Sequence, residues 1–130
     1  MRENKIQQKL ENLNKALSRF ATALNAPIDP DQLMIEASIQ CFEFSYELTW
    51  KFLKDVLEKE GIPANSPREV FREAYSANII SDENLWLTML NDRNLTTHVY
   101  NKKIALEIYG RAKDYFLAMK KLYESYSSNG

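Results

Sequence analysis

The sequence predicts an all-α protein, a five-helix bundle of the up-and-down type. Only 3 glycines and 4 prolines interrupt its 130 residues, which is few for a β-sandwich or barrel that must turn every dozen residues. Hydrophobic residues make up 45% of the chain and recur at steps of three and four. Because 130 residues is a usual size for one domain, we expect a single helical domain over residues 1–126 and a frayed tail over 127–130.

The first helix is predicted over residues 3–24, where apolar side chains repeat on one face. It should end at the segment Asn25-Ala26-Pro27, because a proline does not continue a helix. The apolar positions are Ile6, Leu10, Leu13, Leu17, Phe20 and Leu24.

The second helix is predicted from a capping pattern, with Asp29 as N-cap, Pro30 in the first turn and Gln32 as the returning side chain, as far as Gly61. It is apolar around most of its girth, so it must be covered on two sides, and we expect its own chain and a second copy to share that role. One apolar face holds Ile35, Ile39, Phe42, Tyr46, Leu53 and Val56, and the adjoining face holds Met34, Cys41, Phe44, Leu48 and Phe52.

Three further helices are predicted. Ser66-Pro67-Arg68-Glu69 starts a short one that reaches Ala77, with Val70, Phe71 and Tyr75 facing inward. Ser81-Asp82-Glu83 starts a fourth, and the polar stretch 91–101 is expected to break it before the last helix begins near Asn101. Core positions of the fourth and last helices are Leu85, Trp86, Met89, Leu90, Ile104, Ile108, Ala112, Tyr115, Met119 and Leu122.

Composition limits the function. The 17 basic and 18 acidic residues give a net charge of −1, so any contact with nucleic acid must be through a local cleft. The single cysteine, Cys41, excludes an intrachain disulfide, and the single histidine, His98, excludes a site built on two histidines of one chain. We expect no bound metal or cofactor. The N-terminus shows no apolar signal core and no segment suits a membrane span, so a cytoplasmic protein is expected.

The stretch from Asn91 to Tyr100 concentrates groups that carry chemistry: a cation, amides, two hydroxyls, an imidazole and a phenol. In a functional interpretation, His98 acts as general acid or base toward an RNA 2′-hydroxyl, Arg93 holds the phosphate, and Asn94 orients it. In the alternative interpretation, His98 is an ordinary loop histidine and Arg93 a surface charge. Because one chain offers one imidazole, a two-fold dimer would supply a proton acceptor and a proton donor without a metal.

Three more side chains are candidates for a supporting role. Glu43 and Glu47 lie one turn apart on the polar stripe of the second helix, and Glu43 would contact the motif first if that helix passes beside it. The alternative is a solvated face in which Glu47 pairs with Lys51. Lys102 follows the motif and could bind a phosphate, or could simply be solvated.

The motif carries a resemblance. Arg93 to Tyr100 resembles the R-x4-H-x-Y motif of HEPN domains. The segments 42–51, 66–68 and 90–94 resemble the nucleotidyltransferase substrate-binding protein family, and this similarity extends from about residue 5 to residue 125.

The resemblance implies a helical bundle that forms a homodimer and works beside a separately encoded minimal nucleotidyltransferase. In HEPN/MNT toxin-antitoxin pairs, the HEPN member is a metal-independent RNase that its partner silences by adenylylating the motif tyrosine. Carried over, Arg93 and His98 would be catalytic, Asn94 supporting, and Tyr100 the modified hydroxyl. Two other functions stay open: a non-catalytic substrate-binding subunit of the nucleotidyltransferase, and a plain helical interaction module.

Overall fold

The computed structural model describes residues 2–28 and 33–127. Every regular element in these two ranges is helical, which confirms the all-α prediction. The α-helices are α1 (Arg2–Asn25), α2 (Leu33–Lys59), α3 (Pro67–Ser76), α4 (Glu83–Leu95) and α5 (Lys102–Ser127), and a 3-10 helix, η1 (Thr96–His98), follows α4 directly. None of the described helices is both long and apolar enough to cross a membrane.

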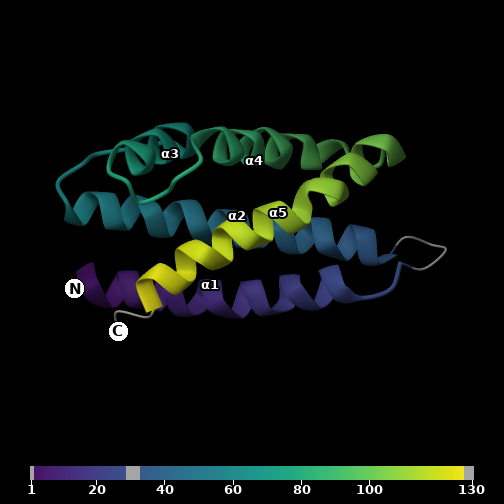
Figure 1. Cartoon of the computed structure of the whole chain (residues 1–130), viewed down its shortest axis with the longest axis horizontal. Coiled ribbons are helices and arrows are strands. Elements are labelled where there is room, and N and C mark those ends of the chain that lie inside the picture. Colours follow the sequence, from purple (N-terminus) through teal and green to yellow (C-terminus); the bar gives the residue numbers. More distant parts are fainter. Residues whose placement is uncertain (1, 29–32, 128–130) are drawn as a thin grey trace.

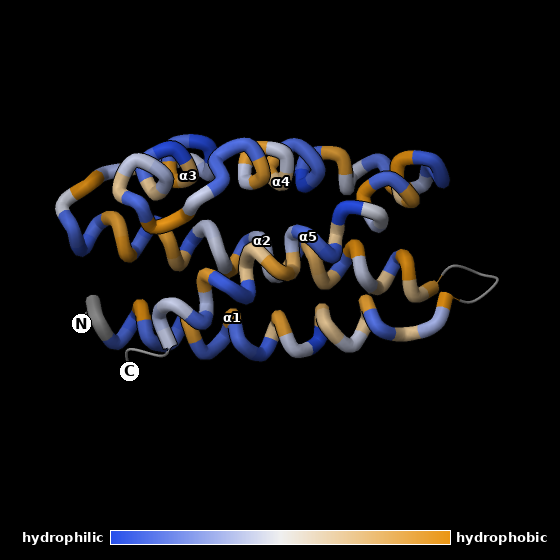
Figure 2. The backbone as a smooth tube through the Cα atoms, in the orientation of Figure 1, coloured by the Kyte–Doolittle hydropathy of each residue, from blue (hydrophilic) through white to orange (hydrophobic). Residues whose placement is uncertain are grey.

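Helix α2 lies at the centre of the bundle and packs against α1, α3 and α5. Figure 1 shows α1 and α2 running side by side, α5 crossing them at an angle, and α3 and α4 following one another along the other side of α2. Figure 2 shows hydrophobic residues recurring at regular intervals along each long helix, as expected for helices with one buried face. The motif joins α4 to α5 at the end of the bundle where α2 begins.

A chain of aromatic contacts ties four helices together. Tyr115 of α5 stacks on Phe42 of α2 with ring centroids 5.2 Å apart, and Phe42 lies 6.1 Å from Tyr46 one turn later. Tyr46 meets Phe71 of α3 at 5.9 Å, and Phe71 meets Trp86 of α4 at 5.3 Å. Such pairs add stability beyond the area that they bury, so α4 is connected to the core of the bundle.

The start signals of two helices behave as predicted. Ser66 caps α3 by accepting a hydrogen bond from the backbone N–H of Glu69 at 3.3 Å, with Pro67 at the first helical position. Asp82 caps α4 through the N–H of Leu85 at 3.1 Å. Helix α2 ends just before Gly61, whose φ of 78° suits a residue without a β-carbon. The cap predicted at Asp29, Pro30 and Gln32 lies outside the described residues.

The chain covers one face of α2 completely and the other only in part. All six residues of the first predicted face are buried. On the second face Phe52 is buried, Met34, Cys41 and Leu48 are half-buried, and the side chain of Phe44 is 65% exposed. The fold itself therefore leaves an apolar strip of α2 only partly covered between Met34 and Leu48, and Phe44 is its most exposed residue.

Three predicted details are wrong. The stretch 91–101 does not break the fourth helix at its start, because α4 runs to Leu95 and continues as η1. Its polar residues are compatible with a helix because Asp92 and Thr96 are buried and hydrogen-bonded. Tyr75 does not face inward: it is 45% exposed, and Ala74 is buried instead. Ser127, predicted as the first residue of the frayed tail, is the last residue of α5, and residues 128–130 lie outside the described range.

Candidate functional site

The motif occupies the tightened end of α4 and the turn into α5. Arg93 lies in the last turn of α4, His98 ends η1, and Tyr100 lies in the turn that follows. The hydroxyls of Thr96 and Thr97 donate to the carbonyls of Arg93 and Asn94, at 2.7 and 3.1 Å. These bonds satisfy carbonyl groups at the end of the helix, where the intrahelical partners run out.

Asn101 fixes the start of α5 behind the motif. Its side-chain oxygen accepts hydrogen bonds from the backbone N–H groups of Lys103 and Ile104, at 3.0 and 3.2 Å, as an N-cap does. The chain between Leu95 and Lys102 is therefore held at both ends. The result is a short, ordered turn that displays His98 and Tyr100.

The guanidinium of Arg93 is oriented by three side chains. Its Nε donates to Oε1 of Glu47 at 3.3 Å, and its Nη1 donates to Oγ1 of Thr96 at 3.0 Å. Nη1 also lies 3.6 Å from Oε2 of Glu43. Nη2 makes no hydrogen bond to any described residue, and the side chain is 29% exposed. Arg93 thus keeps one edge of its planar fork available for a ligand.

Glu47 is itself held in place. Its Oε2 accepts a hydrogen bond from Nε1 of Trp50 at 3.0 Å and lies 4.0 Å from Nζ of Lys51. The carboxylate therefore has a defined direction before it meets Arg93. The sequence left two alternatives open for Glu43 and Glu47, a pair of carboxylates presented to a metal or a base, or a solvated face with Glu47 paired to Lys51. The structure contains the pair with Lys51, and Glu47 also bonds Arg93. The contact expected for Glu43 is also present.

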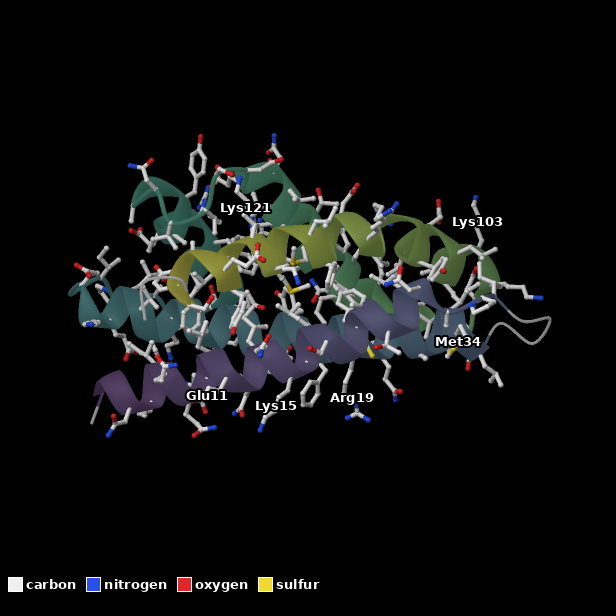
Figure 3. The ribbon with its side chains drawn as sticks, turned by 60° about the horizontal axis from the view of Figure 1, so that its bottom comes forward. Glu11, Lys15, Arg19, Met34, Lys103 and Lys121 are labelled. Atoms are coloured by element: carbon white, nitrogen blue, oxygen red, sulfur yellow. The ribbon has the colours of Figure 1, made fainter. Side chains whose placement is uncertain are left out.

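The charge of Arg93 acts locally in a nearly neutral protein. The chain carries a net charge of −1, and Arg93 faces two carboxylates. Its charge is therefore felt mainly at the free edge of the guanidinium, over a short range. Figure 3 shows Glu11, Lys15 and Arg19 on the outer side of α1, and Lys103 and Lys121 at separate places along α5. These labelled cations lie on different surfaces and do not form one continuous basic face.

His98 and Tyr100 form a second, separate pair. Nδ1 of His98 and the phenolic oxygen of Tyr100 are 3.1 Å apart, and the rings meet edge to face with centroids 5.8 Å apart. Both side chains are exposed, and Tyr100 is 83% exposed. A ligand or a partner protein can reach this pair without any rearrangement of the core.

The structure does not bring all the predicted residues together. Among the described residues, Arg93 and His98 make no hydrogen bond with each other. Within the same part of the chain, the side chains of Asn94 and Lys102 are exposed and make no hydrogen bond or ion pair. No three His, Cys, Asp or Glu side chains of the described residues lie close enough to hold a metal ion. The chain therefore presents two separate clusters, Arg93 with its two carboxylates and His98 with Tyr100.

A buried network next to Arg93 was not predicted from the sequence. Asp92 is 1% exposed, and its two carboxylate oxygens accept hydrogen bonds from Nε and Nη2 of Arg111, at 2.7 and 2.8 Å. The hydroxyl of Tyr115 also donates to this carboxylate. The only signal in the sequence is spacing: Asp92 follows the core residue Met89 by three positions, and Arg111 precedes Tyr115 by four. The network fixes the end of α4 against α5, one residue before Arg93.

Comparison with known proteins now decides the family. Residues 8–128 match the family described as nucleotidyltransferase substrate binding protein like, which is nearly the whole chain. The chain belongs to the nucleotidyltransferase substrate-binding protein-like family. This finding bears out the resemblance given by the segments around the motif, and the HEPN-type assignment with it.

One relative matched by sequence and one solved structure also resemble this chain. The chain is 31% identical over 96 residues to the "Probable ribonuclease HepT" of Haemophilus influenzae, a match that covers 70% of this chain and 66%, just under two thirds, of that protein. A crystal structure from Thermus thermophilus superposes with a TM-score of 0.79 at 36% identity, covering 85% of this chain and 94% of that one.

A third relative has a similar fold over almost the full length of both chains. It is a Haemophilus influenzae protein whose structure is described as the fold of a substrate-binding domain of a nucleotidyltransferase. It matches with a TM-score of 0.66 at 25% identity, over 94% of this chain and 96% of that chain. Every candidate site residue of the present family member falls inside the matched range 8–128.

Because of the buried network, we expect this protein to lose folding stability at alkaline pH. Burial, followed by the hydrogen bond to Asp92, raises the pKa of Tyr115 well above its ordinary value. A group whose pKa is raised by folding stabilises the protein below its unfolded pKa, about 10 for tyrosine, and this stability is lost as the pH rises. We expect the free energy of unfolding to fall above about pH 10, and to fall less steeply in Tyr115→Phe.

Urea denaturation at a series of pH values from about 8 to about 11.5 measures this difference. One proton per molecule corresponds to a difference in slope of at most about 1.4 kcal/mol per pH unit. Tyr46, whose pKa is raised mainly by burial, should leave a residual slope in the same direction. Parallel curves for the wild type and Tyr115→Phe would contradict the role assigned to the network.

Proposed function

We propose that this chain is the HEPN-type subunit of a two-component system, a metal-independent RNase toxin that a partner nucleotidyltransferase silences by adenylylating Tyr100. The observation that supports it best is the exposed pair of His98 and Tyr100 in the same junction as an oriented arginine. An imidazole for proton transfer and a phenol open to a partner protein are the two groups that such a system requires. The name of the Haemophilus ribonuclease relative supports the same function.

In this proposal the free edge of Arg93 binds the scissile phosphate. Nη2 would donate to a phosphate oxygen and balance the charge that develops during attack by the 2′-hydroxyl. Glu43, Glu47 and Thr96 orient the guanidinium of Arg93 before RNA binds. Binding therefore costs little additional conformational entropy of this side chain. The two carboxylates also neutralise the charge of Arg93. This suits a site that binds a short single strand locally and does not attract RNA over a large surface.

His98 transfers the protons. The imidazole of one copy would take the proton of the 2′-hydroxyl, and the imidazole of a second copy would deliver a proton to the leaving 5′-oxygen. Asn94 and Lys102 would support the phosphate from the exposed side of the same turn. Modified Tyr100 would place bulk and negative charge beside His98, in the path of the RNA.

The second copy is proposed to dock on the open strip of α2. Phe44, Cys41 and Leu48 fall on one stripe at helical spacing, beside the stripe of Glu43 and Glu47 that meets Arg93. A two-fold dimer through this strip would bury Phe44 and bring two Arg93 sites toward each other. The shared cleft would then contain two imidazoles.

The alternative is a non-catalytic subunit that binds a substrate for the nucleotidyltransferase. The family description and the description of the second Haemophilus relative favour it. So does the pairing of Arg93 with two carboxylates in the isolated chain, since an arginine already neutralised binds anions less strongly. The experiments below separate the two functions, and a plain helical interaction module would give no signal in the cleavage and labelling assays.

Light scattering at micromolar concentration tests the dimer. We expect twice the chain mass of 15.2 kDa for the wild type and a monomer for Phe44→Arg, because the charge would have to be buried. Leu117→Arg is the matched control, since Leu117 is also exposed but lies far along α5. A monomeric wild type would remove the shared site from the proposal.

RNA cleavage tests the catalytic role. Purified protein should cut single-stranded RNA in EDTA, and His98→Ala should lower the rate by at least about 100-fold, as expected for the loss of a general acid or base. Arg93→Ala should have a comparable effect, while Lys121→Ala, far along α5, serves as the control. Circular dichroism should show the same helix content in all four proteins. Cleavage that survives His98→Ala would exclude the RNase assignment.

Mass spectrometry tests the regulatory role. After incubation with the partner nucleotidyltransferase and Mg-ATP, the wild type should gain the mass of AMP, and Tyr100→Phe should gain nothing because it lacks the acceptor oxygen. Tyr75→Phe, another exposed tyrosine, is the matched control and should be labelled like the wild type. Labelling of Tyr100→Phe would mean that the acceptor lies elsewhere.

A further inference from the structure

The contact between His98 and Tyr100 is not needed for RNA cleavage. Proton transfer to or from RNA uses one ring nitrogen, and the other is available for a different partner. In this structure Nδ1 lies 3.1 Å from the phenolic oxygen of Tyr100, which leaves Nε2 for RNA. The same imidazole is therefore in hydrogen-bond contact with the hydroxyl that the proposed partner would modify.

We propose that His98 is the general base for the modification of Tyr100, a role that rests on the proposed adenylylation. Nδ1 accepts the phenolic proton while the Tyr100 oxygen attacks the α-phosphorus of a nucleoside triphosphate held by the nucleotidyltransferase. The bond between the tyrosine oxygen and the α-phosphorus forms. The bond from that phosphorus to the oxygen that bridges it to the β-phosphorus breaks, and pyrophosphate leaves with the electron pair. The imidazolium then loses its proton to solvent.

A base in contact with the phenol matters because a phenol keeps its proton at neutral pH and is a weak nucleophile until that proton is removed. The distance of 3.1 Å lies within the reach required of a general base. The approach is also open, since Tyr100 is 83% exposed and projects from a turn fixed by the Asn101 cap. A nucleotide carried by another protein can meet the oxygen without displacing any part of this chain.

The other bases near the motif are already occupied. Glu47 accepts hydrogen bonds from Arg93 and Trp50, and Glu43 lies against the same guanidinium. Asp92 is buried and bonded to Arg111. Among the described residues, His98 is the one side chain within hydrogen-bond distance of the Tyr100 oxygen. This chain therefore contributes its own base to the reaction that silences it.

One side chain thus couples two activities. A variant that lacks the imidazole would lose RNA cleavage and would also be a poor acceptor of nucleotide. In the modified protein the tyrosine oxygen is an ester oxygen that carries no proton, so it can accept a hydrogen bond from Nδ1–H but can no longer donate one to Nδ1. Modification would then block the site and also change the hydrogen bonding of the ring that performs the cleavage.

The test follows the initial rate of AMP incorporation in the complex of the full chain with its nucleotidyltransferase. Wild type, His98→Ala and His98→Gln are compared with Lys121→Ala as control, using Mg-ATP and intact-mass detection. We expect both His98 variants to be labelled about 100-fold more slowly than the wild type. We also expect added imidazole to restore the rate in His98→Ala, which a purely structural role of His98 would not allow.

The outcomes distinguish failure of the proposed adenylylation from failure of the proposed role of His98. If the wild type takes up no AMP, the proposed adenylylation fails and this inference fails with it. If the wild type is labelled and both His98 variants are labelled at the same rate, His98 is not the base, although the adenylylation stands. Co-purification of each variant with the nucleotidyltransferase shows that the complex still forms. Slow labelling of His98→Ala without rescue by imidazole, alongside normal labelling of His98→Gln, would also overturn the role.

Discussion

The buried carboxylate of Asp92 fixes the position of the turn that holds the candidate site. Bound by Arg111 and Tyr115, it anchors the end of α4 to α5 at a depth where an unpaired charge would be strongly destabilising. Successive residues of a helix point about 100° apart, so the next residue, Arg93, is directed away from α5 and toward α2. Two neighbouring residues of opposite charge thus attach α4 to two different helices. The motif turn that follows starts from this fixed point.

Much of the fold could be predicted because its long helices bury simple apolar stripes. The predicted core positions of α1, α2 and α5 are largely buried, and the caps of α3 and α4 use the side chains that the sequence indicated. The end of α4 was misplaced because polarity alone does not distinguish a loop from a helix with buried polar groups. Asp92 and Thr96 have the composition of a loop, yet both are buried and hydrogen-bonded to arginine side chains. Partners 19 residues away, as for Asp92 and Arg111, have no periodic signal.

The candidate site, too, contains residues that local spacing predicts and residues that only the fold reveals. Local spacing indicated Arg93, His98 and Tyr100, and the contact of Glu43 was predicted on the condition that α2 passes beside the motif. The hydrogen bond from Trp50 to Glu47 could not be predicted, because a tryptophan at helical spacing is first of all a packing residue. Its indole N–H gives direction to a carboxylate that in turn directs the arginine. The candidate site residues are thus visible in the sequence, whereas the residues that orient them become visible only in three dimensions.

A single histidine per chain sets the final constraint. Catalysis with two proton transfers, and a modification that needs a base, would together require more imidazoles than one chain has. In the proposed function a dimer would solve the first problem by supplying a second copy, and the two ring nitrogens of His98 would solve the second by serving different partners. Both solutions depend on the short turn between η1 and α5, which keeps Tyr100 beside Nδ1 and leaves Nε2 open. The geometry of that turn is therefore what would allow one histidine, near the centre of one motif, to serve both proposed reactions.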